Sequence, residues 1–231
     1  MTLSIPDQLN SAELRINNSL SNTDIKAAVL KKGYDDQKFQ EGKTLLADAR
    51  TKHSRQVELE GLAQKSTEIE IAAKSDAYSI YTDISETVRG KFTSGSPVLS
   101  SLGLIGAIPR STARFIERGY TLFDNIPTSA EVVKILSDKG YTAEVLTEGR
   151  AKIAAYQKAN EDQGNAMTAA ESATEERDKA LKALNKWISE YTTDAKIALK
   201  NNKTLLEAIG IPVRKNNRGK KKPAAKITEV K

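Results

Sequence analysis

The residues with the clearest chemistry in this sequence are the basic side chains of its last 18 positions. Clustered Lys and Arg side chains neutralise phosphates and release counterions, which gives salt-sensitive binding that reads no base sequence. The candidate residues for contact with an anion or a nucleic acid are Arg214, Lys215, Arg218, Lys220, Lys221, Lys222 and Lys226. No aromatic residue stands among them to stack on bases. The same charges would serve an anionic surface or an acidic partner, or would only keep the chain soluble.

This C-terminal segment also carries the whole excess of positive charge. The chain has a formal charge of +6, and residues 214–231 hold eight basic side chains against one acidic one, which leaves residues 1–213 with a net −1. A body close to neutral lacks the strong self-repulsion that resists association. The segment has no apolar periodicity, so we expect it to be disordered.

Two features that would indicate catalysis do not meet the requirements of their chemistry. Gly42-Lys43-Thr44 matches the end of a phosphate-binding loop, but Gln37 stands where that loop needs a glycine. His53 is the only histidine, and Arg50 stands where a di-iron helical bundle needs a glutamate. Cysteine is absent, which excludes disulfides and thiolate metal sites. We therefore expect no catalytic residue, no metal site and no cofactor, and we expect that the chain is not an enzyme.

An enzyme or a ligand-binding protein stays open as an alternative. It would place a small molecule between the long helices, where polar residues interrupt the apolar pattern. Its convergent polar groups would lie near His53, Gln56, Asn160 and Gln163. The aromatic residues at helical spacing, Trp187 among them, are interpreted as core, with Trp187 filling one end of the bundle.

The elements that position these residues occur twice. Residues 32–89 and 139–196 align without a gap at a constant offset of 107 positions. Lys32-Gly33-Tyr34 recurs as Lys139-Gly140-Tyr141, and Glu41-Gly42 recurs as Glu148-Gly149. Ile-Pro recurs with a period of 103, at residues 5, 108 and 211. The sequence therefore predicts two helical repeat units that share one core, 1–107 and 108–213, followed by the segment 214–231.

Apolar residues at heptad spacing predict a long helix in each copy. In the second copy one register holds from residue 146 to residue 198 and places Met167 in the seam; the middle of each seam is polar. Two structures compete: one long helix per copy, about 85 Å at 1.5 Å per residue, or a fold-back into a four-helix bundle. We favour long helices, because the middle of the first copy offers only Gly61 as turn chemistry.

Short helices are expected outside the long ones. Thr128 with Glu131 three residues later indicates a capping box for a helix over 129–139, the counterpart of one over 24–32. The apolar segment 98–108 is interpreted as a buried connector, because residues 205–211 repeat it at the equivalent place. We predict an all-α fold: an internally duplicated long-helix bundle with an antiparallel coiled-coil-like core, short capping helices and a disordered basic C-terminal tail.

The function expected from this architecture is that of a non-enzymatic structural or scaffold protein. It would act through helical protein–protein interaction or self-assembly, with itself or another protein as partner. The alternative is a nucleic-acid-associated accessory protein that binds phosphates through the basic tail. Residues 1–20 lack the basic and apolar segments of a secretory signal, and no apolar stretch reaches the roughly 20 residues of a membrane span. We expect a cytoplasmic protein, with non-classical export left open.

Overall fold

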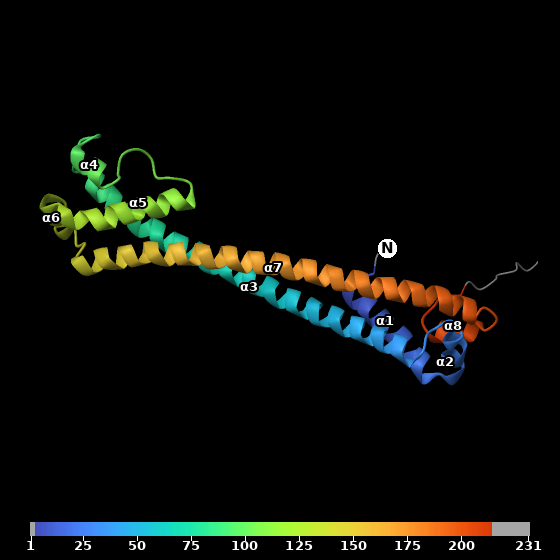
Figure 1. Cartoon of the computed structure of the whole chain (residues 1–231). Helices are drawn as coiled ribbons and strands as arrows, with labels where there is room; N and C mark the ends of the chain where they lie inside the picture. Colours follow the sequence, from blue (N-terminus) through green and yellow to red (C-terminus); the bar gives the residue numbers. More distant parts are fainter. Residues whose placement is uncertain (1–2, 214–231) are drawn as a thin grey trace, which may run out of the picture. The chain divides into compact units, whose positions relative to one another are not determined.

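The computed structural model describes residues 3–213, so the predicted disordered tail and its basic residues lie outside the described part of the chain. Between residues 3 and 213 every regular element is a helix (Figure 1). In chain order they are α1 (Ile5–Ser21), α2 (Thr23–Leu30), α3 (Asp36–Arg89), α4 (Pro97–Ser101), α5 (Thr112–Asn125), the 3-10 helix η1 (Ile126–Thr128), α6 (Ala130–Ser137), α7 (Ala143–Ala198) and α8 (Lys203–Ala208). The all-α prediction is confirmed.

The two long helices are continuous. α3 has 54 residues and α7 has 56, and α3 packs against α7 with the opposite chain direction (Figure 1). Gly61 and Gly164 lie inside these helices, and neither has a positive φ. A glycine in a helix costs about 1 kcal/mol relative to alanine but does not by itself make a turn. The prediction of long helices is therefore confirmed, and the fold-back alternative is wrong.

The structure keeps the offset of 107 positions. The long helices begin at Asp36 and Ala143, the short helices before them at Thr23 and Ala130, and α1 and α5 at Ile5 and Thr112. Each of these pairs differs by 107. The turn before each long helix holds a glycine with a left-handed backbone, at φ +88° in the first copy and +87° in the second. Glycine adopts this conformation without the strain of a side chain, so the same turn directs the chain in both copies.

The short helices begin at side-chain caps. The Asn22 side chain accepts hydrogen bonds from the backbone N–H groups of Asp24 and Ile25, at 3.0 and 3.1 Å, and so caps α2. Ser129 caps α6 in the same way, through the N–H of Val132. The predicted cap of α6, Thr128, is wrong by one position, because Thr128 belongs to the preceding 3-10 turn.

Contacts group the chain into two compact units. Unit 1 comprises residues 1–52 and 178–231, of which 3–52 and 178–213 are described, and unit 2 comprises residues 53–177. Each unit therefore combines the beginning of one sequence copy with the end of the other. The predicted division into repeat units 1–107 and 108–213 concerns the sequence repeat, and it stays a prediction.

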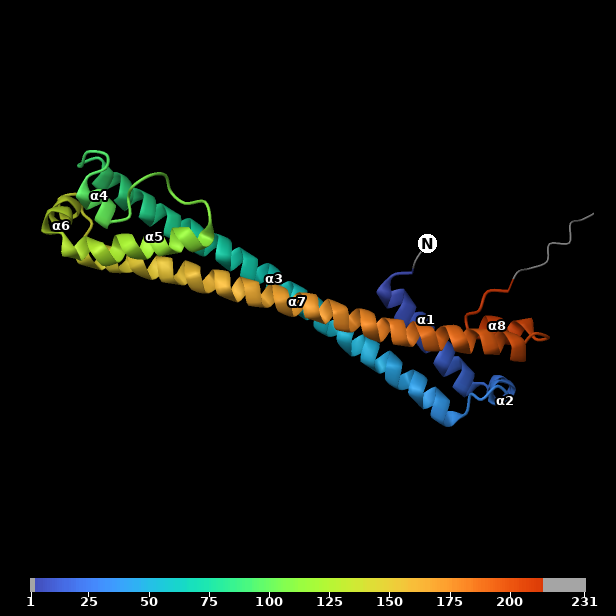
Figure 2. The same cartoon turned by 45° about the horizontal axis from the view of Figure 1, so that its top comes forward.

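The core of unit 1 is an aromatic cluster of Tyr34, Phe39, Trp187 and Tyr191. Their ring centroids lie 5.0–6.3 Å apart, and all four side chains are buried. α1, α2 and α8 lie beside the α3 and α7 segments of unit 1 (Figure 2) and contribute buried side chains to the same core. Burial, together with the Asp194 carboxylate that accepts from its hydroxyl, raises the pKa of Tyr34 above its ordinary value. The prediction that Trp187 fills one end of the bundle is confirmed.

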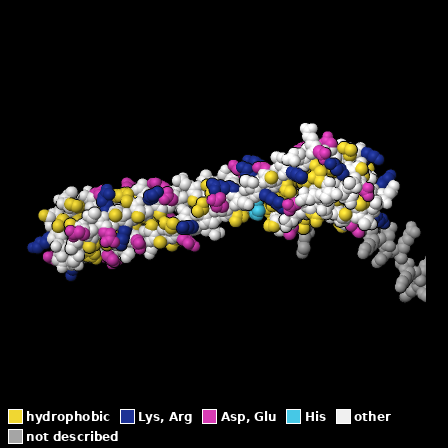
Figure 3. Space-filling model, turned by 90° about the horizontal axis from the view of Figure 1, so that it is seen from below, with side chains coloured by type: hydrophobic (Ala, Val, Ile, Leu, Met, Phe, Trp, Pro, Cys, Tyr) yellow, Lys and Arg dark blue, Asp and Glu magenta, His cyan; other side chains and the backbone are white. Residues whose placement is uncertain are grey.

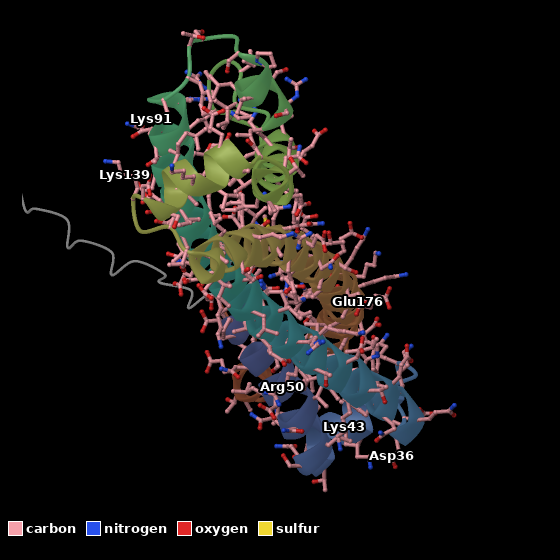
Figure 4. The ribbon with its side chains drawn as sticks, turned by 90° about the vertical axis from the view of Figure 1, so that its left-hand side faces the viewer. Asp36, Lys43, Arg50, Lys91, Lys139 and Glu176 are labelled. Carbon is pink, nitrogen blue, oxygen red and sulfur yellow. The ribbon has the colours of Figure 1, made fainter. Side chains whose placement is uncertain are left out.

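An ion pair links α1 to α3 in unit 1. Arg50 donates two hydrogen bonds to the Glu13 carboxylate, at 3.0 and 2.6 Å. These hydrogen bonds lower the pKa of Glu13. Arg50 follows Asp36 and Lys43 along α3 at seven-residue spacing (Figure 4). Since about 40% of each side chain of the Arg50–Glu13 pair is exposed, the pair orients α1 more than it stabilises the unit.

The core of unit 2 is built around Phe115 of α5. Its ring stacks on Tyr78 at 4.1 Å and meets Tyr81 and Tyr156 edge-on at 5.2 and 6.0 Å. Leu99 and Leu104 from the connector between α3 and α5 are also buried in this core. The second-copy counterparts of this connector, Leu206 and Ile211, are buried in unit 1. The interpretation of both segments as buried connectors holds for these side chains, whereas Ile105 of the first segment is 45% exposed.

Candidate interaction site

The candidate site lies on the part of α3 and α7 that belongs to neither core. In unit 2 the apolar core that α4, α5 and α6 share with the long helices ends at Ala73 on α3 and at Tyr156 on α7. We call the remainder of this helix pair in unit 2, residues 53–72 of α3 and 157–177 of α7, the central segment. At its α7 end, Gln157 accepts a hydrogen bond from Tyr120 of α5 at 2.9 Å. Beyond this contact with α5, the buried residues of the segment belong to the two long helices.

Small residues form the interior of the central segment. Ala159, Ala170 and Ala173 of α7 are buried there, and Ala63 of α3 is half-buried. The hydroxyls of Thr67 and Thr174, which the sequence places in the polar middle of the seam, donate to carbonyl groups of their own helices at 2.9 and 3.0 Å. They therefore make no hydrogen bond between the helices. Of the large apolar side chains in the segment, Leu59 is half-buried and the others are exposed.

Large apolar side chains of the central segment face the solvent instead. Those of α3 and α7 are exposed as follows: Val57 by 54%, Leu62 by 49%, Ile69 by 53%, Ile71 by 60% and Met167 by 45%. Residues seven positions apart occupy the same side of an α-helix, so Leu62 and Ile69 form one row. Val57 and Ile71 are fourteen positions apart, with the polar Gln64 between them, and form a second row on another side of α3. Apolar side chains also reach the surface among charged ones in Figure 3. Aligned apolar side chains of this kind mark interaction surfaces more often than single ones do.

The exposure of Met167 differs from the heptad prediction, which places it in the seam. The interior at this level is filled by alanines, so the longer thioether lies outside, where the Gln163 amide donates to its sulfur at 2.9 Å. Met167 borders a shallow groove of about 320 Å³. The groove is lined by Glu60, Ala63, Gln64, Met167, Ala170, Glu171 and Thr174.

The central segment is acidic. Residues 53–72 hold four acidic and two basic side chains, and residues 157–177 hold five acidic and two basic ones. Among the described residues, Glu60, Glu68, Glu70 and Glu171 form no ion pair. Their charges are therefore available to a cationic partner.

The polar residues proposed for an enzyme site do not share a described groove. Gln56 is buried, and the Nδ1 atom of His53 is buried without a hydrogen-bond partner among the described residues. Asn160 borders a different groove, together with Glu117 and Tyr120 of α5, and none of the other three residues lines it. Within residues 3–213 no group of three or more His, Asp or Glu side chains is placed to hold a metal ion. That the chain is not an enzyme stays a prediction.

A second cavity of unit 2, of about 590 Å³, lies between α5, η1, α6 and the beginning of α7. Val133 and Ala143 form part of its wall. At the equivalent positions of unit 1 stand Lys26 and Asp36, which form an ion pair of 2.6 Å. Unit 2 thus has two apolar residues at the positions where unit 1 has an ion pair.

Sequence reasoning placed the candidate site in the C-terminal basic segment, which lies outside the described residues. It did not single out the exposed apolar side chains of α3. A signal was present, because Val57, Leu62, Ile69 and Ile71 lie off the positions that continue the seam from Gln56 and Ala63.

Comparison with protein-family models, with curated proteins and with solved structures finds no match to this chain. Of the helices within residues 3–213, none combines the length and the apolar character that crossing a membrane requires. The geometry of the central segment is therefore the main evidence on function.

Proposed function

We propose that this protein is a non-enzymatic scaffold that acts through helical protein–protein interaction, first of all with other copies of itself. The observation that supports this is the pair of exposed apolar rows on α3, Leu62 with Ile69 and Val57 with Ile71. Burying one such side chain contributes about 1.5–3 kcal/mol relative to leaving it in water. A partner that covers one row, with its two side chains, thus gains about twice that amount before the entropy of association is subtracted.

A helical partner suits this surface for a geometric reason. The rows run along α3, which packs against α7, and further helices that pack on a row would turn a two-helix segment into a four-helix one, with a core between the pairs. Apolar side chains at seven-residue spacing are what a helix lying along such a surface contacts. The near-neutral body, with a net −1 over residues 1–213, does not oppose the approach of a second copy.

Two further predictions made from the sequence are independent of this proposal. Nucleic-acid binding through residues 214–231 is the alternative function, and a cytoplasmic location is the expected one. The absence of cysteine from all 231 residues agrees with that location.

The double variants Leu62→Gln/Ile69→Gln and Val57→Gln/Ile71→Gln test the proposal in the full chain. We expect the wild type to show a mass above the 25.2 kDa of one chain at micromolar concentration. Each double variant should raise the dissociation constant by about tenfold or more, because two buried side chains contribute more than the 1.4 kcal/mol that a factor of ten represents. Light scattering coupled to size-exclusion chromatography measures the mass.

The matched control is Leu30→Gln/Ile197→Gln, because these side chains are 54% and 51% exposed but lie outside the central segment. This variant should keep the wild-type mass, and all variants should keep the wild-type circular dichroism. A control that dissociates as far as the central variants would reject the central segment as the interface.

A further inference from the structure

Charge is distributed unequally between the two compact units. Unit 1, with residues 214–231 included, holds 22 basic and 12 acidic side chains, whereas unit 2 holds 14 basic and 18 acidic ones. The net charges are therefore +10 and −4. Complementary charges on two surfaces favour their encounter and fix their register. Between copies, the favourable pairing brings the basic part of one chain to the acidic part of another.

We propose that the basic segment 214–231 of one copy binds the acidic central segment of a second copy, along the groove between α3 and α7. This inference rests on the proposed self-association and adds a second contact to it, in a groove that none of the four apolar row residues lines. The groove supplies a carboxylate from each helix, Glu60 from α3 and Glu171 from α7. Ala63 and Ala170 line the same groove with small apolar side chains.

The composition of the segment matches this groove. Lys220-Lys221-Lys222 and Lys226 flank Pro223-Ala224-Ala225, so small apolar residues stand between basic ones. Such a sequence can set small side chains against the alanines while its lysines reach the carboxylates at the rim. Proline donates no backbone hydrogen bond and favours an extended chain, which suits a shallow groove.

The length of the segment is also sufficient. An extended chain spans about 3.3–3.6 Å per residue, so the 18 residues after Val213 reach up to about 60 Å. The acidic part of α3, residues 56–76, is about 30 Å long at 1.5 Å per residue. One segment therefore reaches every carboxylate of the central segment.

Three carboxylates of the central segment are available for such a contact. Glu60, Glu68 and Glu171 form no ion pair among the described residues, whereas Asp124 pairs with Arg150 and Asp162 with Lys158. A single exposed ion pair contributes at most about 1 kcal/mol, so several must form together. Salt screens exposed charges within about 10 Å at 0.1 M, and the contact should weaken as salt is added.

A charge exchange between two full-length variants tests the inference. The acidic-to-basic variant carries Glu60→Lys, Glu68→Lys and Glu171→Lys; the basic-to-acidic variant carries Lys220→Glu, Lys221→Glu and Lys222→Glu. Each alone should raise the dissociation constant of self-association by about tenfold or more, since like charges then face each other. An equimolar mixture should regain wild-type affinity, because each tail then meets a central segment of opposite charge. Light scattering at low salt gives both results.

The control variant carries Asp83→Lys, Glu86→Lys and Glu117→Lys, three exposed acidic residues of unit 2 outside the central segment. It should associate like the wild type. A mixture that stays as dissociated as its components would overturn the inference. So would a basic-to-acidic variant that self-associates normally but no longer binds a labelled DNA duplex, because the segment would then serve nucleic acid.

Two further outcomes separate this inference from the proposed function. A wild type that is monomeric under all conditions would reject both. A wild type that assembles but is insensitive to either charge reversal would reject only the role of residues 214–231. A single chain that carries both sets of charge substitutions could regain wild-type self-association although the mixture of the two variants does not. This result would place the contact within one copy and overturn the proposed contact between copies.

Discussion

Replacement of Trp187 by alanine should lower the free energy of unfolding by about 3–5 kcal/mol, the range for removing a large aromatic side chain from a packed core. The indole stacks on Tyr191 at 5.5 Å and meets Tyr34 and Phe39 edge-on at 5.9 and 6.3 Å, so its loss leaves a cavity that rigid rings cannot fill. Phe115→Ala should have an effect of similar size, because Phe115 holds the same central position in unit 2. Thermal and denaturant unfolding measure both.

The location of the damage tests the division into two units. After Trp187→Ala, hydrogen exchange should accelerate most within residues 3–52 and 178–213, and after Phe115→Ala within residues 53–177. Leu181→Ala, a smaller change in unit 1, is the matched control and should give the same pattern as Trp187→Ala at lower amplitude. Equal loss of protection in both units after either replacement would contradict two separate cores.

The four glycines of the long helices should respond to alanine in opposite directions. A Cβ at Gly42 would lie 2.7 Å from the Trp187 ring, and one at Gly149 would overlap the Phe123 ring. A Cβ at Gly61 or Gly164 would have nothing within 4 Å. Overpacking a core costs about 1–3 kcal/mol, whereas alanine gains up to about 1 kcal/mol over glycine in an open helix position.

Gly42→Ala and Gly149→Ala should therefore destabilise the protein, and Gly61→Ala and Gly164→Ala should stabilise it. The two pairs share the chemical change and the helical backbone, so each pair is the control for the other. Thermal denaturation followed by circular dichroism gives the sign. Stabilisation by all four would mean that the long helices do not approach their neighbours closely at Gly42 and Gly149.

The sequence predicts the helices of this protein well because their signals are local. The heptad spacing and the lack of turn residues near Gly61 predict continuous long helices, and the recurrence of Gly33 as Gly140 predicts the same turn in both copies. The 107-residue offset indicates which residues play equivalent parts. The Ile-Pro recurrence does not: Ile5 begins α1, whereas Ile108 precedes α5 and Ile211 follows α8.

The candidate site was harder to predict because it depends on which side chains the interior can hold. A heptad pattern ranks positions by spacing alone, so it puts Met167 and the neighbouring alanines in one seam. In the structure the alanines fill that seam and Met167 lies outside. The exposure of Leu62 and Ile69 likewise follows from the absence of a third helix in the apolar core at that level, which is a tertiary property.

The most direct test of the proposed function is the mass of the full-length wild-type chain across a concentration series, at low and at high salt. The structure predicts a mass above 25.2 kDa that grows with concentration. It also predicts that salt reduces the association without abolishing it, since apolar burial persists when charges are screened. A mass of 25.2 kDa at every concentration and in both salts would contradict self-association, and with it the role of the central segment as an interface between copies.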